Sequence, residues 1–203
     1  MTLSAKGTRL NRRGLETRRH LLKVALSVLA QGGPEAVSAN LIAREAGVTW
    51  GTVQHQFGDA DGLWAGVLEY VAEHRGPVFE TVTESSDVAG RVSAVVAAMW
   101  ASLDLPGQKA LYNLRKALPR ERGELESQYP KTAAAIANWD GEWTAMCEAA
   151  FEGLDVDRDR LARVRALLPG AIRGVREEQY FSSYADTDAA KQGLVDALSL
   201  YLA

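Results

Sequence analysis

Apolar residues recur at intervals of three and four along most of the chain, which is the spacing of helices that bury one face. The first clear case is residues 14–31, where Leu22, Ala25, Leu26 and Leu29 would lie on one side of a helix. The stretch GGP at 32–34 ends this helix, because glycine and proline are unfavourable in a helix interior.

Two short helices are predicted next. Ser38 is a suitable N-cap for the first, which would end at Gly47, where glycine adopts a positive φ at little cost. Thr49 would cap the second, which runs to about Phe57 with Val53 buried on the same side. A further helix over 59–76 would link these elements to the rest of the chain.

The helical spacing continues beyond residue 77, and no segment alternates between apolar and polar residues as a strand would. We therefore predict an all-α fold with about nine helices. Pro169 and Gly170 fall inside one of them and should kink or split it, because proline removes a backbone donor. The later helices are expected at 78–84, 87–104, 107–118, 128–153, 157–184 and 187–202.

Composition narrows the class of protein. The chain has 203 residues and one cysteine, Cys147, so it has neither an internal disulfide nor a cysteine set for structural zinc. No apolar run approaches the roughly 18 residues of a membrane helix. We expect a cytoplasmic protein that needs no metal or cofactor.

The net charge of −3 conceals an asymmetry. Residues 1–60 carry eight lysines and arginines against four acidic residues, which gives +4 there and leaves −7 for the rest. Lysine and arginine neutralise phosphates in nucleic-acid binding, so a basic head suggests DNA as a partner. For residues 1–12 alone, a solvated and disordered tail is an equally good explanation.

The stretch AGVTWGTVQHQF, residues 46–57, carries the most specific signal. Two short helices joined by a tight glycine turn are typical of a helix-turn-helix, whose second helix enters the major groove of DNA. With Val53 and Phe57 buried, polar side chains face outward, where Gln54 can pair with adenine and hydroxyls can reach phosphates. The predicted DNA contacts are Ser38, Arg44, Thr49, Trp50, Gly51, Thr52, Gln54, His55 and Gln56.

A purely structural interpretation of the same segment stays open. Trp50 could pack against the larger domain, and Gln54, His55 and Gln56 could be ordinary solvated residues.

The segment resembles the DNA-binding domain of the TetR family of bacterial transcriptional regulators. The resemblance runs through LIAREAGVTWGTVQHQFGDADGLWAGVL, residues 41–68. Where this chain has Gln54, Gln56 and Ala60, the family usually has a tyrosine, a histidine and a lysine. The tyrosine and lysine commonly hold backbone phosphates. DNA binding here would therefore depend on a contact made by Gln54 itself, or more on the basic first helix and tail.

The resemblance implies a DNA-binding domain at 1–60 and a ligand-binding and dimerisation domain at 61–203. It also implies a homodimer that binds a palindromic operator of double-stranded DNA through two recognition helices. A small apolar or amphipathic effector would release the DNA, as in a repressor, and an activator is the alternative.

The dimer would form through the last two predicted helices, about 157–184 and 187–202. Each carries an apolar stripe, and two stripes at the chain end exceed what one bundle core readily buries. Burial of both stripes within the monomer is the alternative. The stripes are Leu161, Val164, Leu167, Leu168, Ile172 and Val175 on one helix, and Leu194, Ala197, Leu198 and Tyr201 on the other.

Aromatic and sulfur-containing side chains gather in the expected second domain. Helical bundles build ligand pockets from such side chains, although for any one of them core filling is the more frequent explanation. The candidate effector-binding residues are Met99, Trp100, Tyr112, Trp139, Trp143 and Met146.

An enzyme is the main alternative class, but its motifs are missing. The three histidines lack HExxH spacing, and neither a GxSxG elbow nor a glycine-rich phosphate loop occurs. The aspartates after Asp155 lack the glycine and glutamate of a calcium loop, so helix capping by Asp157 explains them better. A protein-interaction adaptor that has lost DNA binding is the second alternative.

Overall fold

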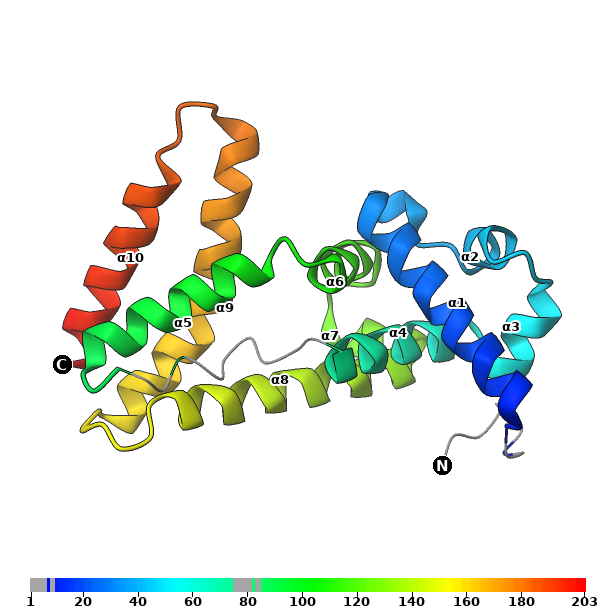
Figure 1. The fold of residues 1–203 in the computed structure, drawn as a ribbon, viewed down its shortest axis with the longest axis horizontal. Coiled ribbons are helices and arrows are strands. Elements are labelled where there is room, and N and C mark those ends of the chain that lie inside the picture. Colours follow the sequence, from blue (N-terminus) through cyan, green and yellow to red (C-terminus); the bar gives the residue numbers. More distant parts are fainter. Residues whose placement is uncertain (1–6, 8–9, 75–81, 83–84) are drawn as a thin grey trace. The chain divides into compact units, whose positions relative to one another are not determined.

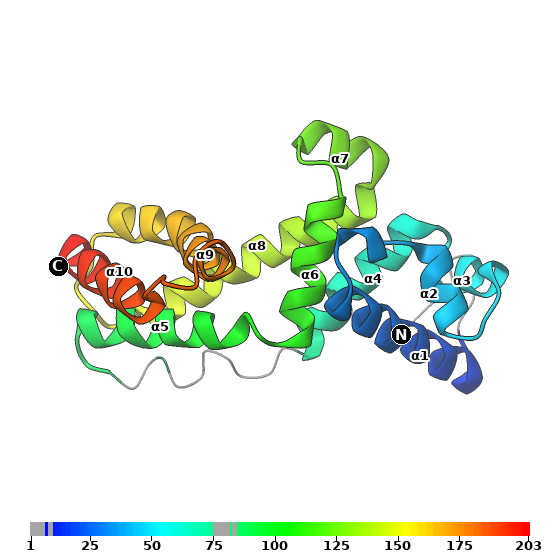
Figure 2. The same ribbon diagram turned by 90° about the horizontal axis from the view of Figure 1, so that it is seen from above.

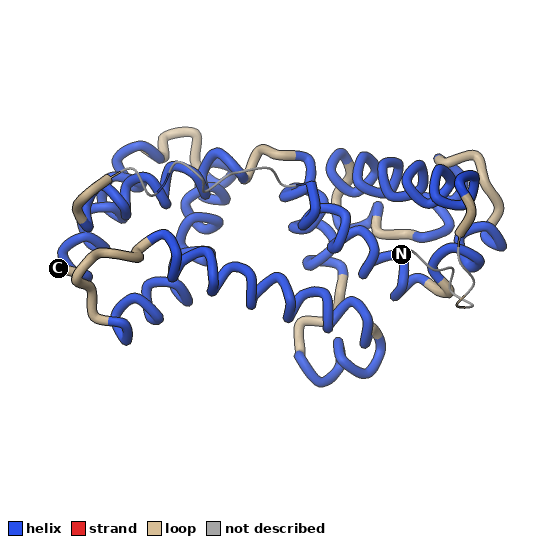
Figure 3. The backbone as a smooth tube through the Cα atoms, turned by 60° about the horizontal axis from the view of Figure 1, so that its bottom comes forward, coloured by secondary structure: helices blue, strands red, loops and turns tan. Residues whose placement is uncertain are grey.

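The computed structural model describes Gly7, residues 10–74, Val82 and residues 85–203. Within these residues every regular element is a helix, which confirms the predicted all-α fold (Figures 1 and 3). The expected helix over 78–84 lies outside the described residues, except for Val82. The elements are α1 (Arg12–Gln31), η1 (Pro34–Ala36), α2 (Ala39–Glu45), α3 (Trp50–Phe57), α4 (Ala60–His74), α5 (Val88–Ser102), α6 (Pro106–Ala117), α7 (Arg122–Gln128), α8 (Pro130–Ala150), α9 (Arg158–Phe181) and α10 (Thr187–Leu202).

The chain forms two compact units, each assembled from two separate stretches. Unit 1 comprises Met1–Gly76 and Leu105–Asp140, and unit 2 comprises Pro77–Asp104 and Gly141–Ala203. Helix α8 runs without interruption from unit 1 into unit 2. The division into 1–60 and 61–203 is a division by function, and it stays a prediction.

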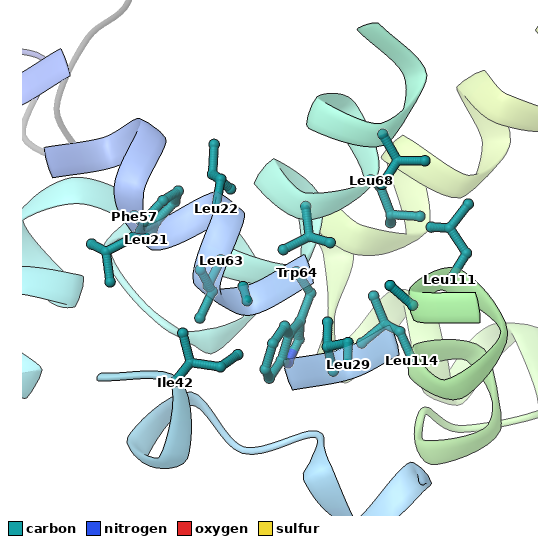
Figure 4. Packing of buried hydrophobic residues seen from close by; sticks show 14 of the residues in the cluster. Leu21, Leu22, Leu29, Ile42, Phe57, Leu63, Trp64, Leu68, Leu111 and Leu114 are labelled. Carbon is teal, nitrogen blue, oxygen red and sulfur yellow. The ribbon is translucent and has the colours of Figure 1, made fainter. Parts of the chain in front are cut away.

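The core of unit 1 draws leucines and other apolar residues from α1, α2, α3, α4 and α6. Figure 4 shows Leu29, Ile42, Trp64 and Leu114 converging from four of these helices. Each short helix is stabilised mainly by this burial, because helices of seven or eight residues are marginal by themselves in water. Helix α6 therefore completes the same core that supports α2 and α3.

Two side chains also tie loop carbonyls to this core. Asn113 of α6 donates through Nδ2 to the carbonyl oxygens of Leu29 and Gly32, at 2.8 and 2.6 Å. These carbonyls lie at the end of α1, where a helix leaves its last acceptors unpaired. His20 Nε2 lies 3.1 Å from the Ala46 carbonyl oxygen and so links α1 to the turn after α2.

The predicted helix over 128–153 is in fact preceded by a separate helix that the apolar spacing did not predict. Helix α7 ends at Gln128, Tyr129 has φ −136° and ψ 61°, and α8 begins at Pro130. A proline disfavours helical backbone in the residue before it but is well suited to the first position of a helix. Pro130 therefore separates two helices where a single one was expected to begin.

Pro169 does not split α9, contrary to one of the two expected outcomes. The helix continues from Arg158 to Phe181. Because proline has no N–H, the carbonyl oxygen four residues earlier, that of Arg165, loses its usual helical donor. The indole Nε1 of Trp143 on α8 donates to this oxygen at 3.1 Å, so a side chain supplies the missing hydrogen bond.

The core of unit 2 is built by α5, α9 and α10, together with the end of α8. Helix α10 packs along both α5 and α9, and Figure 2 shows α5 and α10 side by side. Ile172 and Leu202 are almost completely buried there. Arg91 of α5 is also buried, and it donates to the carbonyl oxygens of Ser85 and Ala150. Its charge thus lies at the end of α8, where helix carbonyls are unpaired.

None of the described helices is by itself long and apolar enough to cross a membrane. Taken together, α5 and α6 would pass such a test on length and composition alone.

Asp61, in the first turn of α4, holds the start of α8. Its buried carboxylate accepts hydrogen bonds from the backbone N–H groups of Lys131 and Thr132, at 2.9 and 2.8 Å. The buried hydroxyl of Thr132 donates to the Asp61 carbonyl oxygen at 3.1 Å, and Lys131 Nζ lies 2.9 Å from Asp59 Oδ2. The first N–H groups of a helix lack intrahelical acceptors and favour a negative charge, so Asp61 joins α4 to α8.

Replacing Asp61 by alanine should lower the free energy of unfolding by about 2–4 kcal/mol, because two buried N–H groups lose a charged acceptor. Urea denaturation followed by circular dichroism measures this change. Glu126→Ala is the matched control, since Glu126 pairs with Arg122 on the exposed surface of α7 and such pairs contribute little. A loss no larger than that of the control would contradict the role assigned to Asp61.

Candidate nucleic-acid interface

The pair α2 and α3 is closed by a turn of the predicted kind. Ser38 Oγ accepts from the Leu41 N–H at 3.3 Å and caps α2, and Gly47 has φ 67°, a conformation that favours glycine. The Val48 N–H then returns to the Ala43 carbonyl oxygen at 3.0 Å. Thr49 is the N-cap of α3, and its hydroxyl lies 3.3 Å from that of Thr52. The predicted caps and turn are therefore confirmed.

Helix α3 has one buried face and one polar exposed face. Val53 and Phe57 are buried in the core of unit 1, as expected. Gly51, Gln54 and His55 are exposed. A helix fits the major groove, and glutamine and histidine side chains can exchange hydrogen bonds with base edges there. This face, from Gly51 to His55, is the most specific recognition surface among the described residues.

Gln56 is the one predicted contact that the structure contradicts. Its side chain is only 4% exposed, whereas a contact to phosphate requires an exposed position. Residues 53, 56 and 57 are three and four apart, so Gln56 falls on the same helix face as Val53 and Phe57. Its Oε1 is buried and has no hydrogen-bond partner among the described residues. The helical spacing alone would have revealed this position.

Trp50 is half-buried and packs against the core of unit 1. Part of the indole therefore has a structural role, which is the alternative that the sequence left open. Thr49 and Arg44 are exposed, and the Arg44 side chain lies 3.4 Å from that of Glu45. Ser38 is half-buried, and its hydroxyl is engaged in capping α2.

Helix α1 brings further positive charge to unit 1. Arg12, Arg13 and Arg19 are exposed, whereas Arg18 is half-buried. The predicted contribution of the preceding basic residues, Lys6 and Arg9, lies outside the described part of the chain. The exposed arginines give the unit cations that can meet phosphates.

The six candidate effector-binding residues are divided between the two units. Tyr112 and Trp139 belong to unit 1, and the methionines and the other two tryptophans belong to unit 2. All six are half-buried. An enclosed cavity of about 10 Å³ in unit 2 is lined by other residues, among them Val92, Cys147 and Phe151. A cavity of this size holds no ligand larger than about one water molecule.

Two of the tryptophans have structural partners. The Trp100 ring centroid lies 4.2 Å from the Arg176 guanidinium and 4.6 Å from the Lys191 ammonium. Arg176 also pairs with Asp104 at 3.0 Å. Trp100 thus holds α5 to α9 and α10 through cation–π contacts. Trp143 supplies the hydrogen bond that Pro169 removes, so both indoles contribute to the packing of unit 2.

Cys147 does not have the environment of a nucleophile. The thiol is buried, and this burial raises its pKa to about 12. The thiol therefore stays protonated at neutral pH, whereas the reactive form is the thiolate. The described residues also contain no group of three or more His, Cys, Asp or Glu side chains that could hold a metal ion.

Comparison with known proteins agrees with this geometry. Residues 21–66 match the family model described as bacterial regulatory proteins, tetR family. No curated protein matches the chain.

Solved structures match over nearly the whole chain. The multidrug binding protein EbrR, solved with imidazole, has a TM-score of 0.64 and 20% identity, covering 97% of each chain. A TetR-family member from Streptomyces coelicolor A3 has a TM-score of 0.62 and 18% identity, covering 91% of this chain and 98% of that one. NalD, the secondary repressor of the MexAB-OprM multidrug efflux pump in Pseudomonas aeruginosa, has a TM-score of 0.60 and 19% identity, covering 93% and 98%.

The helix-turn-helix and these matches define a bacterial DNA-binding regulatory protein. Residues 21–66 are the DNA-binding domain of the TetR family, and the fold of the chain is the fold of TetR-family regulators.

Replacing Gln56 by methionine should raise the free energy of unfolding by about 1 kcal/mol, because a buried acceptor without a partner is replaced by an apolar group of similar length. The variant should bind DNA as tightly as the natural chain. Thermal unfolding and a fluorescence anisotropy titration with DNA test the two parts. A loss of DNA affinity in a folded variant would restore Gln56 to the contact set.

Proposed function

We propose that this protein is a ligand-responsive repressor that binds a palindromic operator as a homodimer. The observation that carries the proposal is the exposed face of α3, with Gly51, Gln54 and His55 held outward by a buried opposite face. This face lies in a TetR-family DNA-binding domain, beside an α1 that presents exposed arginines.

Each residue of the proposed DNA contact set has a distinct task. Gln54 and His55 would read base edges, and Gly51 would let the helix approach them closely. Thr49, Thr52 and Arg44 would reach phosphates, which fix the register on the duplex without reading sequence. The exposed part of Trp50 would contact the groove wall. Ser38 contributes through its cap, since the capped start of α2 presents backbone N–H groups to an anion.

The dimer is proposed to form through α9 and α10, but not through all of the predicted stripe. Leu161, Val164, Leu168 and Ile172 of α9 and Leu198 of α10 are buried in the unit 2 core. This correction leaves a smaller set for a partner. Leu167 is 55% exposed and Leu200 is 81% exposed. Around Gly170, Gly174 and Gly193, an added Cβ would meet no atom within 4 Å. These positions would allow a second copy to approach closely.

The effector is proposed to be a small apolar or amphipathic molecule bound within residues 61–203, in the cytoplasm. Support comes from structures of the same fold, one holding imidazole in a multidrug binding protein and one repressing a multidrug efflux pump. A ligand that binds better to one spacing of the two recognition helices shifts the population toward it and so changes DNA affinity. Release of DNA would then relieve repression.

The protein should bind DNA from upstream of its own gene selectively and with a steep salt dependence, because phosphate contacts release counterions. Anisotropy titrations at two salt concentrations, with upstream and random duplexes, measure both properties. Gln54→Ala should weaken binding to the selected site by about 1–3 kcal/mol and leave random-DNA binding almost unchanged.

Equal losses on both duplexes would show that Gln54 does not read bases. Weak and unselective binding by the natural chain would instead favour the protein-interaction adaptor. Lys23→Met is a suitable control, since Lys23 is exposed on α1 and outside α3.

Replacing Leu200 by glutamate should convert the dimer to monomers, because the change places a charge in the proposed interface and leaves the monomer core intact. Sedimentation velocity measures the oligomeric state. Leu105→Glu provides a matched control, since Leu105 is also an exposed leucine, 42% accessible, but lies at the start of α6. If Leu200→Glu stays dimeric, the interface lies elsewhere.

A further inference from the structure

Arg18 makes an unusual set of contacts for an arginine on a basic helix. It is half-buried, and its Nη1 donates to the carbonyl oxygen of Gln56 at 2.6 Å. Its guanidinium carbon lies 4.2 Å from the centroid of the Phe57 ring. Both partners are the last two residues of the recognition helix α3. Arg18 therefore contacts α3 from the protein side, while its neighbour Arg19 is exposed.

The end of α3 requires such a donor. The last carbonyls of a helix have no intrahelical partner. The Gly58 N–H, in a residue with φ 89°, donates to the Gln54 carbonyl oxygen at 2.8 Å. The Gln56 carbonyl oxygen is instead satisfied by Arg18. A positive charge is also favourable at a helix C-terminus, because the helix dipole is negative there.

Helix α4 encloses the same contact from the other side. A Cβ added to Gly66 would lie 3.0 Å from Phe57 Cε1 and 3.5 Å from Arg18 Nη2, so glycine allows α4 to pass closely. Burial lowers the pKa of Arg18, and the charges of Glu69 and Glu73 on α4 oppose this effect. One guanidinium thus joins α1, α3 and α4.

We propose that Arg18 is a positioning residue for DNA recognition, which sets the orientation of α3 on α1 so that Gln54 and His55 reach the bases. This inference rests on the proposed operator binding. In this arrangement Arg18 gives no charge to the DNA, because its guanidinium is already engaged by Gln56 and Phe57. Its contribution is therefore to selectivity for the operator.

The test is Arg18→Met, which keeps the length of the side chain and removes its donors and charge. We expect operator affinity to fall by about tenfold or more, with random-DNA affinity and the salt slope unchanged. A phosphate contact would behave differently, since its loss weakens binding to both duplexes and lowers the salt slope by about one. That second outcome would overturn the proposal.

Two further variants make the result decisive. Arg18→Lys can still place a cation over Phe57 and donate one hydrogen bond, so we expect operator affinity between those of the natural chain and Arg18→Met. If Arg18→Met fails to fold by circular dichroism, the lysine variant decides by the same comparison of selectivity and salt slope. Arg19→Met removes an adjacent exposed charge and should leave the ratio of operator to random affinity unchanged.

Failure of this inference is distinguishable from failure of the proposed function. If the natural chain shows no selectivity for any upstream duplex, operator binding itself is wrong. If the natural chain is selective and the folded Arg18 variants keep that selectivity, Arg18 does not position α3.

Discussion

Helix α3 has only eight residues, and a helix of that length has no stable orientation of its own in water. Its geometry depends on the burial of Val53 and Phe57 in the core of unit 1. The rest of unit 1 can be understood from this constraint. Helices α1, α4 and α6 supply the opposing apolar surface, and hydrogen bonds at the helix ends keep the elements in register. The polar face of α3 is presented outward because its other face is held inward.

The polar contacts of unit 1 share one chemical theme, which is the pairing of helix ends that cannot pair themselves. Asn113 pairs the carbonyls at the end of α1, Arg18 pairs a carbonyl at the end of α3, and Asp61 pairs N–H groups at the start of α8. Each contact joins two elements distant in sequence, so each also fixes an angle or a register. Since α8 continues into unit 2, its start is anchored beside the DNA-binding helices while its later residues belong to the other unit.

Much of this could be predicted from the sequence, for reasons that are local. Ser38, Gly47 and Thr49 act as caps and turn through their own backbone and side-chain chemistry, and the stripe of α1 follows from spacing. The side of α3 taken by Gln56 could also have been predicted, because it is three residues from Val53. The separation of α7 from α8 was less visible, since the apolar spacing on both sides of Pro130 is helical. The same spacing places Arg18 on the side of α1 that carries Leu21, Leu22 and Ala25.

By itself the sequence determined the elements: where helices begin and end, which residues are apolar enough to be buried, and which short polar segment suits a DNA groove. These depend on backbone propensity, capping and periodicity, all of which act within a few residues. Only the tertiary structure decided which partners meet. It placed most of the α9 stripe inside the monomer, gave Trp143 to the carbonyl freed by Pro169, and turned Arg18 from the solvent toward α3. Such choices depend on contacts between residues 22 to 38 positions apart or more, which no local pattern encodes.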